Sequence, residues 1–472
     1  MCMLKLKTRL LLIKLVATVI IFYGQLFGER GDLISAEVIS TRNVINAQSY
    51  IDQELAQIVS DIFTIDPAQY GYWMYKITYE TINVEGDIHI ASGFLSYPRV
   101  DWPDIADQAF PIMSYQHGTV IERSDVTSEK GEWILPAILS SSGYAYIEPD
   151  YLGLGVSEGM HPYQIKEPYG TAVVDLIRAV KLYARSMNTQ FMVNDQLFLV
   201  GYSEGGYATM AAHQIIERDY SNELNVTISF PMAGAYSMSG IMVDLMIDQV
   251  PYGEPFYFPY VLFAYLDSYP SIGNAEMYLL PEYLFLEDWF DGFHSSSQIN
   301  EVLPSAPITI MKPEEIQNFE SDQNHPLRVA LQQNDLWDWK PEAPVYIFHG
   351  LGDELVPYEN AQMAYDQFIE NGAEEIYIEA IPESFGGHQD VAPWALFGAY
   401  QIAKEAQMIN ELGDINQDRS LDILDLVGIA ILIIDEGGFD SSSYSFWASD
   451  VNMDGLINVQ DIVSLINTIL YI

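Results

Sequence analysis

The sequence is poor in cysteine and in basic residues, and each scarcity excludes a class of protein. Cys2 is the single cysteine among 472 residues, so the chain cannot form an intramolecular disulfide, and a thiol nucleophile is not expected. Twenty Lys and Arg residues face 66 Asp and Glu residues, which leaves a formal charge of -46 and an isoelectric point near 4.1. Because phosphate binding requires clustered basic residues, we expect no nucleic-acid partner.

Long apolar runs are also scarce, and the one present lies at the N-terminus. In residues 1–28, the three basic residues Lys5, Lys7 and Arg9 precede an apolar stretch from Leu10 to Phe27. A membrane anchor needs about 20 apolar residues, and Lys14 interrupts this stretch, so a cleaved signal peptide is preferred. We therefore expect a secreted, extracellular protein.

β-rich and helical segments alternate between Trp73 and Val200, which indicates an α/β fold with a wound sheet. The predicted strands are Tyr75–Thr81, Ile88–Tyr97, Phe110–Tyr115, Tyr144–Pro149, Gln196–Val200, Val226–Phe230, Val345–Phe348 and Glu375–Ile381. The predicted helices are Glu132–Ser140, Tyr169–Ser186 and one that opens at Gly205.

An insertion of about 110 residues, from about 235 to 344, interrupts this series of strands and helices. The segment from Tyr252 to Phe293 holds 14 aromatic residues in 42 positions, and no Lys or Arg occurs from Asp219 to Met311. A loop of this length usually has its own structure or a function. We expect a helical cap with an apolar lining; the alternative is a packing subdomain that does not contact the substrate.

The segment Gly201-Tyr202-Ser203-Glu204-Gly205 follows an apolar strand and precedes a helical run. This is the context of a G-x-S-x-G nucleophile elbow, in which the flanking glycines allow a sharp turn that exposes the serine hydroxyl. Ser203 is therefore the predicted nucleophile.

A serine hydroxyl needs a base, and the chain has eight histidines from which to choose. In this type of site the chain order is serine, acid, histidine, and His388 alone follows the best acid candidate. That acid is Asp353, on a glycine turn after the strand Val345–Phe348, and Glu354 and Asp390 are nearby alternatives. His388 itself is expected in a flexible turn after the last strand.

Acyl transfer also needs donors for the developing oxyanion. We expect one from the backbone N–H of Glu204, which follows the nucleophile. The second is expected from Thr119, in the loop Gln116-His117-Gly118-Thr119 after the strand Phe110–Tyr115.

From about Tyr72 to Asn410 the chain resembles the α/β-hydrolases, and within them the secretory lipases and esterases. The motifs that carry the resemblance are Tyr115–Thr119, Asp150–Gly155 with His161-Pro162-Tyr163, the elbow around Ser203, the loop His349–Pro357, and His388. The resemblance implies hydrolysis of a carboxylic ester through an acyl-enzyme beneath a helical cap. The sequence contains no classical zinc or nucleotide motif, so we expect no catalytic cofactor.

The last 62 residues contain two copies of a twelve-residue acidic pattern, offset by 36 positions. Oxygen-bearing side chains stand at positions 1, 3, 5, 9 and 12, the spacing by which such a loop wraps a calcium ion. The predicted calcium ligands are Asp414, Asn416, Asp418, Asp422 and Asp425 in the first copy, and Asp450, Asn452, Asp454, Asn458 and Asp461 in the second.

This region resembles a type I dockerin, a small all-α module with duplicated EF-hand-type loops that docks onto a cohesin domain. Two features depart from that family. Arg419 replaces the glycine expected at position 6, which strains the first loop. Ile423-Leu424 and Val459-Gln460 occupy positions where dockerins often carry small hydroxyl residues, so the partner could be internal or of another kind.

The predicted organisation is a signal peptide at 1–28, an N-terminal segment at 29–71, a hydrolase domain at 72–410 and a dockerin-like domain at 411–472. The predicted function is a secreted serine hydrolase that cleaves small-molecule or lipid carboxylic esters, like a lipase or carboxylesterase. The alternatives are a feruloyl or acetyl esterase acting on polysaccharides, a serine peptidase of the same superfamily, and a non-catalytic binding protein on a hydrolase scaffold.

Overall fold

The computed structural model describes residues 29–58, 65–99, 108–185, 192–434 and 443–471. The predicted signal peptide lies outside these residues. Within the described ranges, no helix combines the length and the apolar character that a membrane crossing requires.

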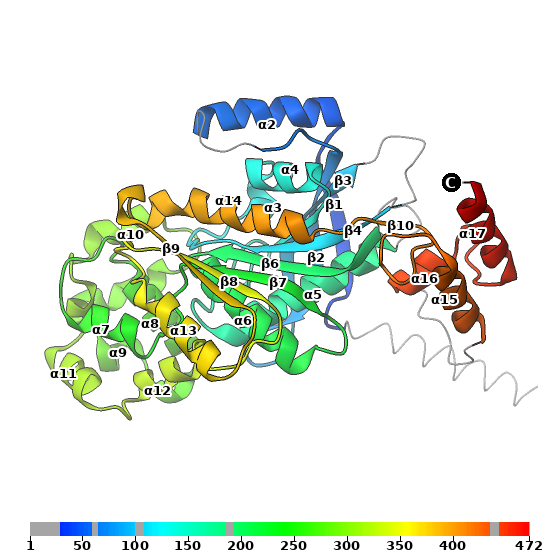
Figure 1. Ribbon diagram of the computed structural model, residues 1–472. Coiled ribbons are helices and arrows are strands. Elements are labelled where there is room, and N and C mark those ends of the chain that lie inside the picture. The colour runs from blue at the N-terminus through cyan, green and yellow to red at the C-terminus, as the bar shows by residue number, and fades with distance from the viewer. Residues whose placement is uncertain (1–28, 59–64, 100–107, 186–191, 435–442, 472) are drawn as a thin grey trace, which may run out of the picture.

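Ten strands form one sheet, which is the centre of the molecule (Figure 1). Nine of them lie in the order β1-β2-β3-β5-β4-β6-β7-β8-β9, and β10 pairs with β4. β1, β2, β3 and β5 pair in antiparallel fashion in that order, whereas β5, β4 and β6 to β9 are mutually parallel. The strands are β1 (Leu33–Arg42), β2 (Gly71–Ile82), β3 (Ile88–Arg99), β4 (Gln108–Gln116), β5 (Ala145–Pro149), β6 (Met192–Tyr202), β7 (Val226–Met232), β8 (Val345–Gly350), β9 (Ile376–Ile381) and β10 (Asn410–Glu411).

All eight predicted strands are confirmed, with most of them longer than expected. β1 was not predicted. Its burial alternates irregularly, because the strand is at the edge of the sheet and carries two register shifts against β2. The N-terminal segment therefore contributes a strand to the central sheet, while the domain boundaries at 71 and 410 stay a prediction.

Helices cover both faces of the sheet, as parallel strands with two buried faces require. α2, α4 and α14 pack on one face, and α5, α6 and α13 pack on the other (Figure 1). Their bounds are α2 (Val44–Ile58), α4 (Ile134–Ser141), α5 (Lys166–Ala184), α6 (Glu204–Asp219), α13 (Glu359–Glu370) and α14 (His388–Ala406), and a short α3 spans Thr127–Lys130. The three predicted helices correspond to α4, α5 and α6.

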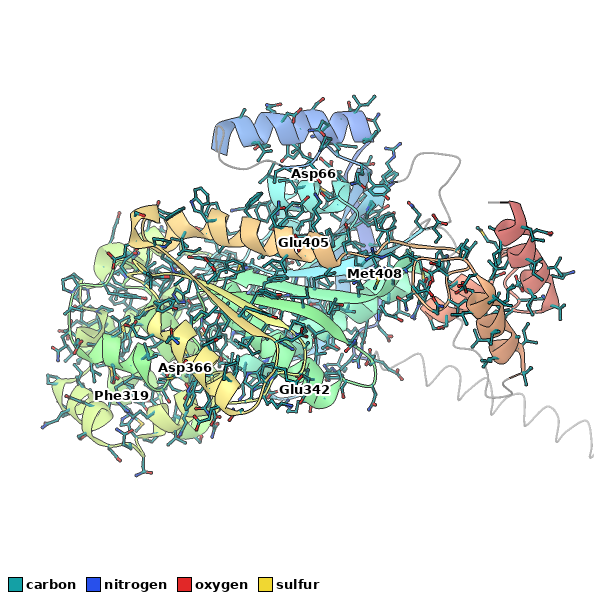
Figure 2. The ribbon with its side chains drawn as sticks, viewed as in Figure 1. Asp66, Phe319, Glu342, Asp366, Glu405 and Met408 are labelled. Carbon is teal, nitrogen blue, oxygen red and sulfur yellow. The ribbon has the colours of Figure 1, made fainter. Side chains whose placement is uncertain are left out.

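The insertion between β7 and β8 folds into helices of its own, which gather at one end of the sheet (Figure 1). Figure 2 shows Phe319, a buried residue of this cap, well away from Met408, which lies on the side of the C-terminal helices. The cap helices are α7 (Ile241–Ile247), α8 (Tyr257–Ser268), α9 (Ala275–Tyr278), α10 (Ser296–Val302), α11 (Pro313–Ser321) and α12 (Pro326–Gln333), with 3-10 turns between them.

The C-terminal region packs against the beginnings of the central strands. Tyr444 and Ala448 form a small apolar cluster with Ala109 of β4 and Met192 of β6. Asn194 of β6 also donates a hydrogen bond to the side chain of Asn410 at 2.7 Å. The helices of this region are α15 (Ile423–Ile434), α16 (Tyr444–Ser449) and α17 (Val459–Tyr471).

Candidate active site

Ser203 lies in a strained turn between β6 and α6. Its backbone has φ 64° and ψ -124°, a conformation that L-residues rarely adopt and that often marks a functional site. The surrounding glycines are sterically required. A Cβ at Gly201 would lie 2.2 Å from the carbonyl oxygen of Gly205, and a Cβ at Gly205 would lie 1.9 Å from that of Gln116.

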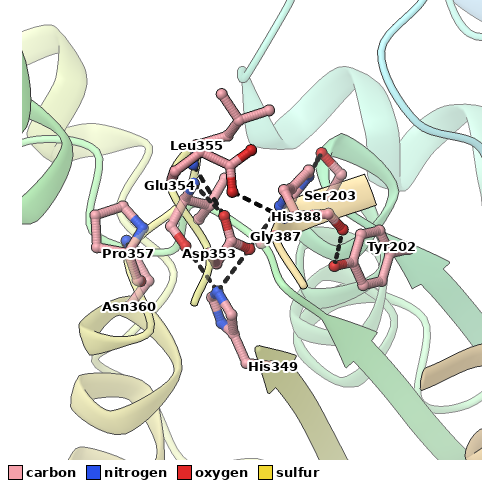
Figure 3. Close-up of polar contacts among 12 residues, drawn as sticks. Tyr202, Ser203, His349, Asp353, Glu354, Leu355, Pro357, Asn360, Gly387 and His388 are labelled. Atoms are coloured by element: carbon pink, nitrogen blue, oxygen red, sulfur yellow. Dashed lines mark hydrogen bonds and ion pairs between the residues drawn. The ribbon is translucent and has the colours of Figure 1, made fainter. Parts of the chain in front are cut away.

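The side chains of Ser203, His388 and Asp353 form one hydrogen-bonded line (Figure 3). Nε2 of His388 is 2.7 Å from Oγ of Ser203, and Nδ1 of His388 is 2.5 Å from Oδ2 of Asp353. The three residues come from the ends of β6 and β8 and from the start of α14. Sequence motifs separated by up to 185 positions thus meet at one edge of the sheet.

His388 does not lie in a flexible turn, as the sequence suggested, but is the first residue of α14. The helix was missed because Gly386-Gly387 indicates a turn and Pro393 lies inside the helix. His388 is 1% exposed, and the hydroxyl of Tyr202 donates to its backbone carbonyl at 2.6 Å. The imidazole is therefore held by packing and does not swing freely.

Asp353 is held by more than His388. Its Oδ1 accepts hydrogen bonds from the backbone N–H groups of Leu355 and Val356, at 3.0 and 2.8 Å. Nε2 of His349 lies 3.2 Å from its Oδ2. Burial alone would raise the pKa of this carboxyl, but hydrogen bonds from His349 and His388 outweigh it and lower the pKa below its ordinary value. Asp353 thus stays ionised.

The two alternative acids serve the backbone instead of the imidazole. Oε2 of Glu354 accepts from the backbone N–H of His388 at 3.0 Å, and Oδ2 of Asp390 accepts from that of Gly387 at 3.1 Å. Both carboxylates therefore satisfy N–H groups at the beginning of α14, which would otherwise lack partners.

The two expected oxyanion donors flank Ser203. Glu204 is the first residue of α6, and Thr119 is in the loop that follows β4. Neither backbone N–H donates to another group in the described part of the chain. The hydroxyl of Thr119 instead pairs with that of Tyr163 at 2.9 Å. His117 is a buried loop residue whose Nδ1 lies 2.8 Å from the carbonyl oxygen of Gly118, a structural role.

Solved structures with the same fold are known. The rice cell wall degrading esterase LipA from Xanthomonas oryzae is 26% identical, with a TM-score of 0.67 over 80% of this chain and 96% of that chain. The chain has the α/β-hydrolase fold. Candida antarctica lipase A in its closed state shares this fold at 19% identity, with a TM-score of 0.58 over 80% of this chain and 82% of that chain. A protein of Legionella pneumophila is 26% identical, with a TM-score of 0.69 over 79% of this chain and 97% of that one.

A sequence model of the secretory lipase family matches residues 122–247, which include the elbow around Ser203. The sequence matches none of the curated proteins with which it was compared. The family match and the structural neighbours together indicate a lipase- or esterase-like hydrolase.

A buried polar cluster behind the nucleophile of this hydrolase was not predicted from the sequence. Oε1 of Glu204 lies 2.9 Å from Nε2 of His161 and accepts from the hydroxyl of Tyr169 at 2.7 Å. Nδ1 of His161 is 2.8 Å from the carbonyl oxygen of Leu152 and must carry a hydrogen there. The imidazole and the carboxyl thus face each other directly in the protein interior.

Beneath the cap, an apolar pocket reaches Ser203. Its volume is about 80 Å³. Its walls come from the hydrolase core and from the cap, including Met238, Met242, Val243, Tyr257, Val261 and Leu331. The cap thus lines the pocket at the nucleophile, contrary to the alternative of a packing subdomain away from the substrate.

The predicted calcium ligands lie in two C-terminal loops with the same hydrogen-bond pattern. At position 1, Asp414 and Asp450 each accept from the backbone N–H groups of positions 5 and 6, at 2.8 to 3.1 Å. At position 12, Asp425 and Asp461 each accept from the N–H groups of positions 3 and 9, at 2.8 to 3.4 Å. The repeat in sequence is therefore a repeat in conformation.

The carboxylates of these loops crowd one another. Burial, with a contribution from Asp414, raises the pKa of Asp425; burial, with contributions from Asp461 and Asp454, raises that of Asp450. A divalent cation would relieve this repulsion, so the donors fit calcium in type. Within the described residues, however, no three His, Cys, Asp or Glu side chains already converge as metal ligands. Arg419 has φ 69°, which confirms the expected strain at position 6.

Proposed function

We propose that this protein is a secreted serine hydrolase that cleaves carboxylic esters through an acyl-enzyme. The observation that carries the proposal is the line from Ser203 through His388 to Asp353, with distances of 2.7 and 2.5 Å and buried acid and base. Secretion rests on the signal-like residues 1–28 and agrees with the name of the matching family.

Each residue of the site has one role in this proposal. His388 removes the proton of Ser203 as the hydroxyl oxygen attacks the ester carbonyl, and Asp353 orients the imidazole and stabilises its charge. The N–H groups of Glu204 and Thr119 stabilise the oxyanion. His388 then returns the proton to the leaving alcohol, and water hydrolyses the acyl-enzyme by the same steps. No catalytic cofactor is required.

The pocket beside Ser203 favours a short acyl group. An apolar cavity of about 150 Å³ holds a benzene ring, whereas this one measures about 80 Å³. A short aliphatic acyl group fits with the cap in this position, and an aromatic feruloyl group does not. Among the polysaccharide esterases, an acetyl or butanoyl esterase is therefore favoured over a feruloyl esterase.

The C-terminal module is proposed to bind calcium and to dock onto a cohesin-like domain. The repeated loop conformation supports the first part. For the second, apolar side chains are exposed at equivalent positions of both helices: Ile423 and Val459, Val427 and Val463, Ile434 and Leu470 are 49% to 77% exposed. Exposed apolar surface of this extent usually marks an interaction site. Ile429 and Leu465, also equivalent, are fully buried.

Hydrolysis of p-nitrophenyl acetate, butanoate and palmitate by the mature protein tests the activity. We expect turnover of the two short esters, and loss of about 10⁴-fold or more in kcat in Ser203→Ala. Ser297→Ala, an exposed position in α10, is the matched control and should keep wild-type turnover. Serine-dependent turnover of peptides but not of esters would favour the peptidase, and no turnover at all would favour a binding protein.

Calorimetric titration of the full chain with calcium tests the module. Two sites are expected in the wild type, and Asp461→Asn should remove one of them. Binding of a purified cohesin domain should require calcium and should fail in the double variant Val427→Asp/Val463→Asp. Asn467→Asp, exposed on α17, is the control. If the protein binds calcium but not the cohesin domain, the proposed partner is wrong while the proposed calcium sites stand.

A further inference from the structure

Two cavities of different chemistry meet at Ser203. One is the apolar pocket beneath the cap, and the other is a wider cleft of about 620 Å³ between the loop after β4, the region around α3 and the start of α14. Ser203 and Tyr257 line both. The carbonyl carbon attacked by Ser203 carries the acyl group on one side and the alcohol on the other. Each cavity can therefore receive one half of the ester.

The cleft has a mixed lining of polar and apolar groups, whereas the pocket is almost wholly apolar. The lining of the cleft includes the charged or polar residues Thr119, Asp125, Lys130, Glu132, Glu148 and Gln389. If a second acyl chain covered these groups, they would lose their water without gaining hydrogen-bond partners, which costs free energy. The alcohol half of the substrate is thus expected to be polar, unlike the acylated glycerol of a triglyceride.

Two aromatic rings form one wall of the cleft. Trp133, half-buried, and Tyr115, buried, have ring centroids 6.1 Å apart at an interplanar angle of 55°. A sugar ring offers an apolar C–H face that packs on an aromatic ring, and hydroxyl groups at its edge. An aromatic wall beside hydrogen-bonding groups is suited to such a mixed surface.

The polar groups of the cleft suit neutral hydroxyls more than charges. Glu148 is buried, and its two carboxyl oxygens already accept hydrogen bonds from Thr127 and Tyr146, so it presents no free charge to the cleft. Lys130 and Asp125 pair with each other at the rim. Gln389, exposed and next to His388, makes no hydrogen bond within the described protein and offers both a donor and an acceptor.

We propose that this cleft binds a sugar, so that the substrate is a short-chain acyl ester of a carbohydrate hydroxyl. The acyl group enters the apolar pocket, and the sugar packs on Trp133 and forms hydrogen bonds with Gln389. This inference rests on the proposed ester hydrolysis at Ser203 and adds the alcohol side of the substrate to it.

The test compares two esters of the same acid, methyl 6-O-butanoyl-glucopyranoside and ethyl butanoate. We expect kcat/KM of the wild type to be at least about tenfold higher for the sugar ester, as one or two good polar contacts would provide. Equal values for the two esters would overturn the proposal. p-Nitrophenyl butanoate is the reference substrate: if it too is not hydrolysed, the proposed function itself fails.

Variants in the cleft and in the pocket show which residues cause the preference for the sugar ester. Gln389→Ala should lower the ratio of the two kcat/KM values by about threefold or more, with Gln401→Ala further along α14 as its matched control. Trp133→Ala should lower the ratio further. If Trp133→Ala does not fold, Gln389→Ala still tests the sugar site. Met242→Phe narrows the acyl pocket and should lower both values alike. A ratio unchanged in both cleft variants would contradict the sugar site.

Discussion

His349 and His388 both contact the same carboxyl oxygen of Asp353: Nε2 of His349 lies 3.2 Å and Nδ1 of His388 lies 2.5 Å from its Oδ2. Replacement of His349 by Phe removes this donor and lets the pKa of Asp353 rise. A lowered folded-state pKa stabilises the fold above the ordinary Asp pKa of about 4. The variant should therefore lose about 2 kcal/mol of unfolding free energy at pH 7.

The same linkage fixes the pH dependence of this effect. As pH falls below about 4, the carboxyl of Asp353 takes up a proton in the unfolded chain first, so its extra stability shrinks, and this stability is lost once the pH falls through the lowered pKa of the folded state. The difference between wild type and variant should therefore shrink. Chemical denaturation at pH 7 and at pH 3 measures it. His349→Gln keeps a donor and should lie close to wild type. A difference that does not depend on pH would mean that His349 acts through packing alone.

The contact between His161 and Glu204 predicts a defect when one partner is removed. His161→Leu takes the imidazole away from the buried carboxyl of Glu204, which then keeps the hydroxyl of Tyr169 as a donor. Loss of one member of a buried pair costs about 3 to 5 kcal/mol. We expect kcat to fall by about tenfold or more, because the backbone N–H of Glu204 is one of the two proposed oxyanion donors.

The double variant His161→Leu/Glu204→Gln is the control for this prediction. Glutamine keeps an acceptor for Tyr169 and carries no charge, so stability and kcat should both recover in part. Steady-state kinetics with p-nitrophenyl butanoate follow kcat, and chemical denaturation follows stability. Recovery of folding without recovery of kcat would contradict an electrostatic role.

Glu148 predicts a loss of stability toward higher pH. Burial raises its folded-state pKa from 4.5 to about 7. The folded state favours the protonated form, so the stability is complete below about pH 4.5 and is lost as the pH rises through about 7, by up to about 3 kcal/mol. Glu148→Gln, which retains partners for Tyr146 and Thr127, should show a flatter unfolding free energy across this range. Equal slopes in wild type and variant would contradict the prediction.

The two C-terminal loops carry different residues at position 6, and each residue can be replaced by the one that the other loop has. Arg419 has φ 69° in the first loop, where Gly455 has φ 79° in the second. A left-handed conformation costs a residue with a Cβ about 1 to 2 kcal/mol. Arg419→Gly should therefore raise the calcium affinity of the first loop, and Gly455→Arg should lower that of the second. Calorimetric titration measures both, and opposite changes in the two variants are the expected result.

Much of the site could be predicted because its chemistry is tied to local patterns. The glycines that flank Ser203 indicate a nucleophile elbow, because no larger residue fits there. A strand followed by a glycine turn indicates Asp353. Alternating strands and helices predicted the sheet in the same way. These features depend on neighbours in sequence, which a single chain reveals.

Contacts between distant segments could not be predicted. The pairing of Glu204 with His161 joins residues 43 positions apart, and nothing in either local pattern indicates it. In the sequence, His349 appeared only as the first residue of the loop that carries Asp353. β1 was missed because an edge strand buries little surface and carries a weak apolar pattern, and its place depends on the register of β2.

The pairing of β10 with the beginning of β4 places the C-terminal region at one defined end of the sheet. Asn410 faces Ala109 at the start of that strand, whereas Ser203 follows the other end of the neighbouring β6. The cap and the C-terminal helices consequently lie at opposite poles of the sheet (Figure 1). If the protein is attached to a partner through its C-terminal helices, the pocket at Ser203 lies at the other end of the sheet from that partner. The length of the sheet then sets the distance between the pocket and the point of attachment.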